Sequence, residues 1–251
     1  MLAIPDILAG WFTARGWDLH PHQRAMLARA DAPATLLIAP TGGGKTLAGF
    51  LPSLIDLTER PANRPRLHTL YISPLKALAV DIARNLEQPA REMDLPVTIE
   101  TRTGDTPSHK RQRQRHTPPD ILLTTPEQLA LLLAHPSAEE FFASLQCVIL
   151  DELHALVASK RGDLLSLGLA RLWRLAPQMR TVGLSATVPQ TEPLRRWLVP
   201  QNDQGTDGLA DLVTGAGGAE PDISILATQE RIPWQGHLAR HAYKDVYAAI
   251  R

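Results

Sequence analysis

The residues best suited to chemistry form a glycine-rich stretch that ends in a lysine and a threonine. APTGGGKT (Ala39–Thr46) follows an apolar segment that favours a strand and precedes a segment with helical periodicity. In that context, glycine N–H groups and a helix N-terminus bind phosphate oxygens. Lys45 is expected to reach the β- and γ-phosphates of a nucleotide, and Thr46 to offer its hydroxyl to Mg²⁺. The predicted nucleotide-binding residues of this phosphate loop are Thr41, Gly42, Gly43, Gly44, Lys45 and Thr46.

Two carboxylates follow a second apolar segment. CVILDELH (Cys147–His154) places Asp151 and Glu152 where a predicted strand ends. Because ligands of open α/β sheets bind at the carboxyl ends of the strands, both motifs are expected to face one crevice. Asp151 is suited to hold Mg²⁺ through water, and Glu152 to orient or deprotonate an attacking water. Together the two motifs predict ATP hydrolysis, with Lys45, Asp151 and Glu152 as the catalytic residues.

Each motif has a simpler alternative when it is taken alone. Ala39 stands where the pattern GxxxxGK[ST] has its first glycine, so the loop alone is also consistent with a glycine-rich turn and a solvated lysine. The acidic pair alone is also consistent with a helix N-cap, where carboxylates are favoured by the helix dipole. The combination of the two motifs argues against both alternatives.

Short apolar runs alternate with helical patterns along the chain, which predicts an α/β fold built from βαβ units. Several runs are almost continuously apolar, as expected for strands that are covered on both faces of a parallel sheet. Residues Gln201–Pro221 are rich in Gly, Asp and Ala and are predicted to form a loop or hairpin. The predicted strands are Thr35–Ala39, Leu67–Ser73, Val97–Thr101, Ile121–Thr124, Cys147–Asp151, Thr181–Ser185 and Ile223–Leu226. The predicted helices are Lys45–Leu57, Leu75–Met93, Glu127–Ala134, Asp163–Leu175 and Glu192–Leu198.

Composition narrows the class of protein further. The 251 residues include 26 Lys+Arg and 26 Asp+Glu, so nucleic-acid binding must come from local patches. The single cysteine, Cys147, excludes an internal disulfide framework and a Cys-rich zinc site. No apolar segment approaches the ~20 residues that span a bilayer, and the N-terminus lacks a signal-peptide pattern. We therefore expect a cytoplasmic protein without a membrane partner.

The order of three motifs resembles that of superfamily 2 helicases. APTGGGKT, DELH and LSAT (Leu184–Thr187) match motifs I, II and III of that superfamily, in which alanine commonly replaces the first loop glycine. SPLKALAVD (Ser73–Asp81) resembles motif Ia, and TTPEQL (Thr124–Leu129) resembles motif Ib. With TRTGDT (Thr101–Thr106) and SKRGD (Ser159–Asp163), the chain is similar to the large-helicase-related (Lhr) family. The similarity is strongest to its short form, the ligase-associated DNA damage response DEXH-box helicase.

This resemblance implies a RecA-like P-loop NTPase domain, a three-layer sandwich with a mainly parallel sheet that uses ATP and Mg²⁺. Gln23, in HPHQ, matches the glutamine that contacts adenine; a solvated residue at a helix start is the alternative. His154 matches the histidine that links the nucleotide site to motif III. Ser185 and Thr187 match the hydroxyls that couple hydrolysis to strand movement, with simple strand-end capping as the alternative.

Nucleic-acid contacts are expected on loops along one edge of the sheet. Hydroxyls, amide N–H groups and one lysine there suit phosphodiester contacts without base readout. The polar stretch Ser108–His116, together with Lys160 and Arg161, either adds to this surface or is merely solvated. The predicted contact residues are Ser73, Lys76, Thr103, Gly104, Thr124 and Glu127.

The resemblance also implies a domain organisation and partners. Residues 1–226 would form the first RecA-like domain, and residues 227–251 a connector toward a second RecA-like domain in cis, with ATP at the interface. The partner would be single-stranded or partially duplex DNA, with a 3′–5′ motor role in repair and a repair ligase or nuclease as a further partner. A nucleotide- and nucleic-acid-binding module without catalysis, and an RNA helicase domain, remain open alternatives because no residue reports on the 2′-hydroxyl.

Overall fold

The computed structural model describes residues 4–40, 42–58, 67–201, 208–215 and 242–250. Contacts divide the chain into two units, Met1–Gly217 and Gly218–Arg251. Within the described residues, the first unit contains a seven-stranded sheet with its helices, and the second contains the helix α11 (Tyr243–Ile250). The candidate site lies in the first unit.

The sheet is parallel throughout, with the strand order β3-β4-β2-β5-β6-β1-β7. Parallel pairing directs the carboxyl ends of all strands to the same edge, which is the edge where ligands bind in such folds. The strands are β1 (Ala34–Ile38), β2 (Thr69–Ile72), β3 (Ile99–Arg102), β4 (Ile121–Thr124), β5 (Cys147–Leu150), β6 (Arg180–Ser185) and β7 (Asp211–Thr214).

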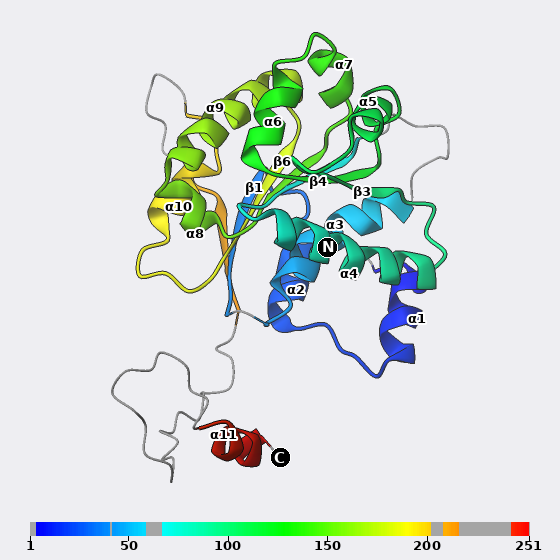
Figure 1. The fold of residues 1–251 in the computed structure, drawn as a ribbon, viewed down its shortest axis with the longest axis vertical. Coiled ribbons are helices and arrows are strands. Elements are labelled where there is room, and N and C mark those ends of the chain that lie inside the picture. Colours follow the sequence, from blue (N-terminus) through cyan, green and yellow to red (C-terminus); the bar gives the residue numbers. More distant parts are fainter. Residues whose placement is uncertain (1–3, 41, 59–66, 202–207, 216–241, 251) are drawn as a thin grey trace. The chain divides into compact units, whose positions relative to one another are not determined.

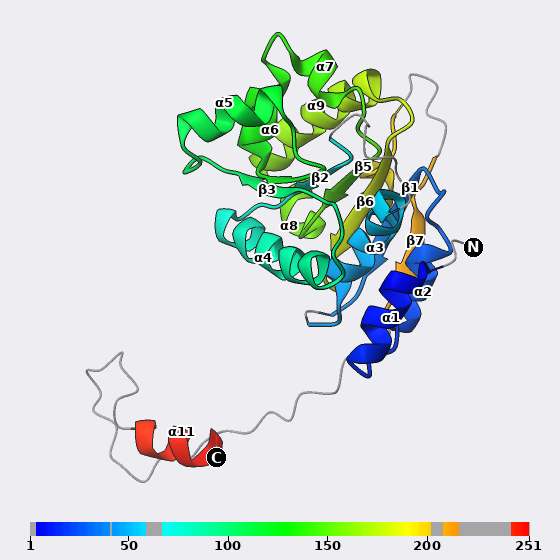
Figure 2. The same cartoon turned by 90° about the vertical axis from the view of Figure 1, so that its right-hand side faces the viewer.

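Helices cover both faces of the sheet, so the unit is a three-layer sandwich (Figure 1, Figure 2). The helix α1 (Asp6–Ala14) packs outside α2 and α3, and α5 (Ser108–His116) connects β3 to β4. One face carries α2 (Pro21–Leu27), α3 (Lys45–Thr58) and α4 (Lys76–Glu92). The other face carries α6 (Pro126–Leu133), α7 (Ala138–Phe142), α8 (Leu153–Val157), α9 (Lys160–Leu175) and α10 (Glu192–Trp197).

The continuous apolar runs are explained by burial on both sides. In β1, Leu36 and Ile38 pack into one core cluster, whereas Leu37 packs into the cluster on the opposite face. Each fully buried leucine contributes roughly 1.5–3 kcal/mol relative to an exposed one, so both faces stabilise the central strands. The α/β sandwich predicted from the sequence is confirmed.

One prediction from the sequence is wrong in part, and another falls on residues that the structure does not describe. Part of Gln201–Pro221, predicted as a loop or hairpin, forms β7, which pairs in parallel with the edge of β1 from Thr35↔Asp211 onward. The short run DLVT has little apolar signal, and its backbone bonds to β1 stabilise it as an edge strand. The predicted strand Ile223–Leu226 lies outside the described residues.

Within the described part of the chain, no helix is both long and apolar enough to cross a membrane.

Candidate functional site

The phosphate loop (residues 39–46) joins β1 to α3. Gly42 and Gly44 have φ angles of 80° and 74°, a left-handed region that favours glycine. The loop therefore turns sharply and brings Lys45 to the first position of α3. The Lys45 side chain is 8% exposed, and its Nζ donates to the Ala39 carbonyl at 2.8 Å. Thr41 lies outside the described residues.

The acidic strand end is equally buried. Asp151 directly follows β5, is 4% exposed, and accepts hydrogen bonds from the Tyr71 hydroxyl and from the Glu152 N–H at 2.9 Å. Burial raises the pKa of the Asp151 carboxyl, and the Lys45 ammonium opposes that rise. The two motifs are therefore close enough to interact electrostatically. Burial and the neighbouring Asp151 charge raise the pKa of Tyr71, so its hydroxyl stays a donor.

A polar contact connects the acidic motif to the end of β6. His154 Nδ1 lies 3.0 Å from Ser185 Oγ, and His154 Nε2 lies 3.5 Å from Glu152 Oε2. The Ser185 carbonyl also accepts from the Ala39 N–H at 3.2 Å, so this residue contacts the phosphate loop as well. Thr187 is exposed, and its hydroxyl forms no hydrogen bond with a described residue.

Gln23 anchors α2 to the phosphate loop. Its Oε1 accepts from the His20 N–H at 2.8 Å, and its Nε2 lies 3.5 Å from the Gly44 carbonyl. The side chain is 3% exposed. The rings of His20 and His22 stack beside it, with centroids 5.4 Å apart, and burial lowers the pKa of His22. The segment before the loop is thus packed against it.

A cavity of about 330 Å³ borders the loop at Gly44 and Thr46. Its outer wall comes from α1 and α4 and was not predicted from the sequence. Arg15 lies 4.3 Å from the Trp11 ring centroid and 5.7 Å from that of Trp17, and it pairs with Glu92. The WFTARGW spacing of two tryptophans around an arginine was the available signal.

The predicted nucleic-acid residues share the sheet edge but differ in accessibility. Ser73 and Thr124 are fully buried, and the Thr124 hydroxyl donates to the Arg102 carbonyl at 2.8 Å. Thr103 is 5% exposed, beside the exposed Gly104. These buried hydroxyls could contact a nucleic acid only if the loops moved. The backbone groups of the same residues already lie at the edge of the sheet.

The charged members of this edge bind one another. Lys76 Nζ lies 3.1 Å from Asp105 Oδ1. Glu127 accepts two hydrogen bonds from Arg161, at 2.5 and 3.0 Å. In α5, Lys110 and Arg113 face Glu100, whereas Lys160 is exposed and forms no ion pair with a described residue.

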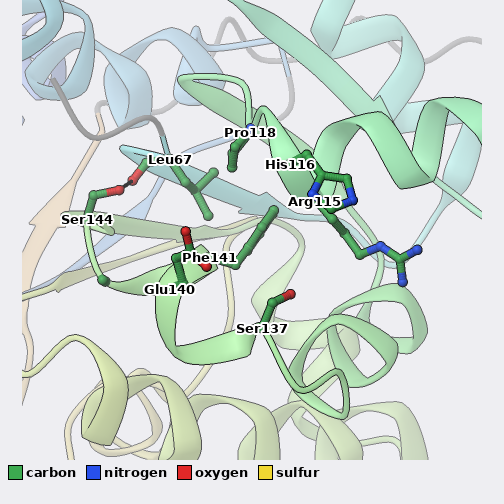
Figure 3. Close-up of a pocket in the computed structure, with 9 residues that line it drawn as sticks. Leu67, Arg115, His116, Pro118, Ser137, Glu140, Phe141 and Ser144 are labelled. Atoms are coloured by element: carbon green, nitrogen blue, oxygen red, sulfur yellow. Dashed lines mark hydrogen bonds between the residues drawn. The ribbon is translucent and has the colours of Figure 1, made fainter. Parts of the chain in front are cut away.

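A second cavity, of about 360 Å³, lies away from these motifs (Figure 3). Leu67, Pro118 and Ser144 line it from segments that precede β2, β4 and β5, so it belongs to the opposite edge of the sheet. Within the described residues, no group of three or more His, Cys, Asp or Glu side chains could hold a metal ion.

The model of the DEAD/DEAH box helicase family matches residues 20–195. The chain belongs to this family. It is 39% identical over 236 residues to the "ATP-dependent helicase Lhr-Core protein 2" of Thermococcus barophilus, which covers 88% of this chain and 27% of that protein. It is 46% identical over 206 residues to the "Lhr helicase/ probable uracil glycosylase" of Mycolicibacterium smegmatis, covering 76% and 14%.

Solved structures agree with these relatives. The Mycobacterium smegmatis helicase Lhr bound to ssDNA and AMP-PNP matches with a TM-score of 0.77 and 35% identity, over 98% of this chain and 32% of that chain. The helicase MrfA bound to DNA matches with a TM-score of 0.70 and 26% identity, over 84% and 29%. The similarity to Lhr proteins predicted from the motifs is confirmed. The chain spans between 14% and 27% of the length of the first curated relatives.

Proposed function

We propose that this chain is the ATP-binding motor domain of an ATP-dependent DNA helicase or translocase of the Lhr type. The observation that carries the proposal is the meeting of two buried opposite charges, Lys45 and Asp151, beside a glycine loop with left-handed turns. Burying a charge costs free energy unless the charge is paired with a ligand or another group. A metal-bound polyphosphate is a ligand that Lys45 and Asp151 could both bind.

Mg²⁺ fits the donors at this site. The Asp151 carboxylate and the Thr46 hydroxyl are hard oxygen ligands. Burial raises the pKa of Asp151 in spite of its hydrogen bonds and the Lys45 ammonium, so a cation beside this carboxylate would be favourable. A Mg²⁺ ion held by Asp151 and Thr46 would supply positive charge opposite the phosphate oxygens. On nucleotide binding, we expect the Lys45 ammonium to exchange the Ala39 carbonyl for phosphate oxygens.

Glu152 is the proposed residue that orients or deprotonates the attacking water. Its backbone has a φ of 48°, and its Oε2 lies 3.5 Å from His154 Nε2. His154 and Ser185 would transmit the state of this site to β6, and Thr187 would join them when the loop after β6 moves. Gln23 and the cavity beside Gly44 would hold the base.

The nucleic-acid partner is proposed to be single-stranded or partially duplex DNA. The loops 73–76, 103–106 and 124–127 would track the backbone through N–H groups and Lys76. The relatives described as bound to ssDNA and DNA support this choice over RNA. Sequence resemblance alone suggests the repair role and a ligase or nuclease partner.

We also propose that residues 1–226 act with a second RecA-like domain in cis, through the connector 227–251. The longer relatives support this arrangement. In such motors an arginine of the second domain stabilises the transition state, an effect on the order of 10³–10⁵ in related phosphoryl transfer. The 251-residue chain alone is therefore expected to bind nucleotide and to hydrolyse it poorly.

ATP binding and hydrolysis by the chain, with and without single-stranded DNA, test this proposal. Lys45→Ala should weaken nucleotide binding by on the order of a hundredfold, because it removes a charged hydrogen-bond donor from a buried site. Glu152→Gln should retain binding and lose the residual turnover. Nucleotide affinity that is unchanged in Lys45→Ala would refute the nucleotide site. Rapid DNA-stimulated turnover by the 251-residue chain would refute the need for a second domain. Turnover that survives Glu152→Gln would exclude Glu152 as the catalytic base, whereas nucleotide binding without any turnover in the unsubstituted chain would favour a binding module.

A further inference from the structure

Arg161 joins two loops of the proposed nucleic-acid edge. Its Nε and Nη2 donate to the carboxylate of Glu127 at 2.5 and 3.0 Å, and its Nη1 donates to the Pro74 carbonyl at 2.5 Å. Glu127 lies in the first turn of α6, after β4, whereas Pro74 lies in the loop after β2. These strands are neighbours in the sheet, so one guanidinium fixes two adjacent loops.

The path from the catalytic carboxylates to Arg161 is short and tightly packed. The helix α8 begins directly after Glu152, and its Leu153 and Leu156 are buried. Ser159 closes the turn: its Oγ donates to the Leu156 carbonyl at 2.8 Å and accepts from the Gly162 N–H at 3.2 Å. A Cβ at Gly162 would lie 2.1 Å from the Leu156 carbonyl oxygen. The turn is therefore packed so closely that no side chain fits at Gly162.

Neither stability nor direct phosphate contact accounts well for this arrangement. The Arg161 and Glu127 side chains are 40% and 47% exposed, and exposed ion pairs add little to stability. Three of the five guanidinium N–H groups already have protein acceptors. A carboxylate beside the guanidinium would also repel a phosphodiester. Orientation of the loops is the effect that a bidentate pair with a third backbone bond supplies.

We propose that Arg161 is a positioning residue. Through Glu127 and Pro74 it orients the loops 73–76 and 124–127 according to whether a nucleotide is bound beside Glu152. This inference rests on the proposed function and adds the link between its two sites. Arg161 also lowers the pKa of Glu127 to about 2, so the pair persists through the neutral range.

Anisotropy of a labelled oligothymidylate, with and without AMP-PNP and Mg²⁺, tests the link in the 251-residue chain. Arg161→Ala and Glu127→Ala should each weaken the AMP-PNP-bound affinity about tenfold, within the usual range for coupled sites. The double variant should be no weaker than either, and AMP-PNP affinity measured without DNA should stay unchanged. Lys160→Ala, which removes an exposed neighbouring charge, is the matched control and should lose no more than about twofold, a single screened phosphate contact.

If Arg161 instead contacts DNA directly, the DNA affinity of Glu127→Ala should change in the opposite direction. Glu127→Ala would then tighten binding, because it removes a negative charge and releases the guanidinium; that result overturns the proposal. So does a full additive loss in the double variant.

Hydrogen exchange at Leu75, whose N–H is donated to Ser73 Oγ at 3.3 Å, separates this inference from the proposed function. If the unsubstituted chain binds neither AMP-PNP nor DNA, the proposed function fails. Faster exchange at Leu75 in Arg161→Ala than in Lys160→Ala would still support the positioning role, whereas equal exchange would overturn it.

Discussion

The proposed nucleotide site and the proposed nucleic-acid loops share one edge of one sheet, yet they are built in opposite ways. At the nucleotide site the charges are buried: Lys45 is 8% and Asp151 4% exposed. At the nucleic-acid loops the charged side chains are exposed, with 55% of Lys76 and 78% of Asp105 accessible, and they neutralise each other. Buried charges interact strongly and tolerate little change, whereas exposed pairs are screened by water and salt.

The comparison indicates where single substitutions matter. A site that relies on desolvated groups in a fixed loop fails when one group moves. A surface that relies on several backbone N–H groups and exchangeable ion pairs loses affinity in small steps.

The largest expected difference is between two glycines. Gly44 has a φ of 74°, and a Cβ there would lie 3.0 Å from Gln23 Nε2. Gly44→Ala should weaken nucleotide binding by roughly tenfold to a hundredfold, since strain of about 1–3 kcal/mol shifts the loop away from the conformation that is proposed to bind phosphate. At Gly104 the nearest atom is the flexible end of Lys76, 3.3 Å away, so Gly104→Ala should leave nucleotide affinity unchanged.

Titration with a fluorescent ATP analogue measures both glycine variants. Gly10→Ala serves as a control, because a Cβ there meets nothing within 4 Å. Equal losses of nucleotide affinity in Gly44→Ala and Gly104→Ala would contradict the distinction between a rigid and a tolerant loop.

A smaller effect is expected at Lys76. Lys76→Ala should weaken single-stranded DNA binding only severalfold and reduce the salt slope of log K by about 0.7, the value for one phosphate contact on a single strand. Asp105→Asn should tighten binding, because it releases the lysine ammonium from its partner. Binding isotherms at several salt concentrations give both numbers. A slope that does not change in Lys76→Ala would remove this residue from the contact surface.

The smallest effect concerns stability at Asp151. Burial raises its folded pKa above the unfolded value, so the folded state binds more protons and stability falls as pH rises between the two pKa values. At neutral pH the buried charge therefore destabilises the chain, and Asp151→Asn should raise Tm by about 2–4 °C. Thermal unfolding at pH 4 and pH 7.5 should show the gain at the higher pH alone. A lower Tm at pH 7.5 would mean that the bonds from Tyr71 and Glu152 outweigh the desolvation.

Prediction from the sequence succeeded where a pattern is local. Continuous apolar runs predicted the central strands, because burial on both faces leaves no polar alternation. The loop between β1 and α3 and the acidic pair after β5 lie where two patterns of eight residues each placed them, and their roles stay predictions. The edge strand β7 was missed, since DLVT depends on pairing with a partner more than 170 positions earlier in the chain (Thr35↔Asp211).

The same distinction between local patterns and long-range contacts applies to single side chains. The sequence by itself determined the fold class, the order of the loops at one sheet edge and the residue types that we propose bind a nucleotide. Only the tertiary structure decided that Arg161 binds Glu127 and Pro74, that Ser73 and Thr124 are buried, and that Trp11, Arg15 and Glu92 wall a cavity beside Gly44. The physical reason is distance along the chain: local patterns follow backbone periodicity, whereas these contacts depend on how separate helices pack across the sheet.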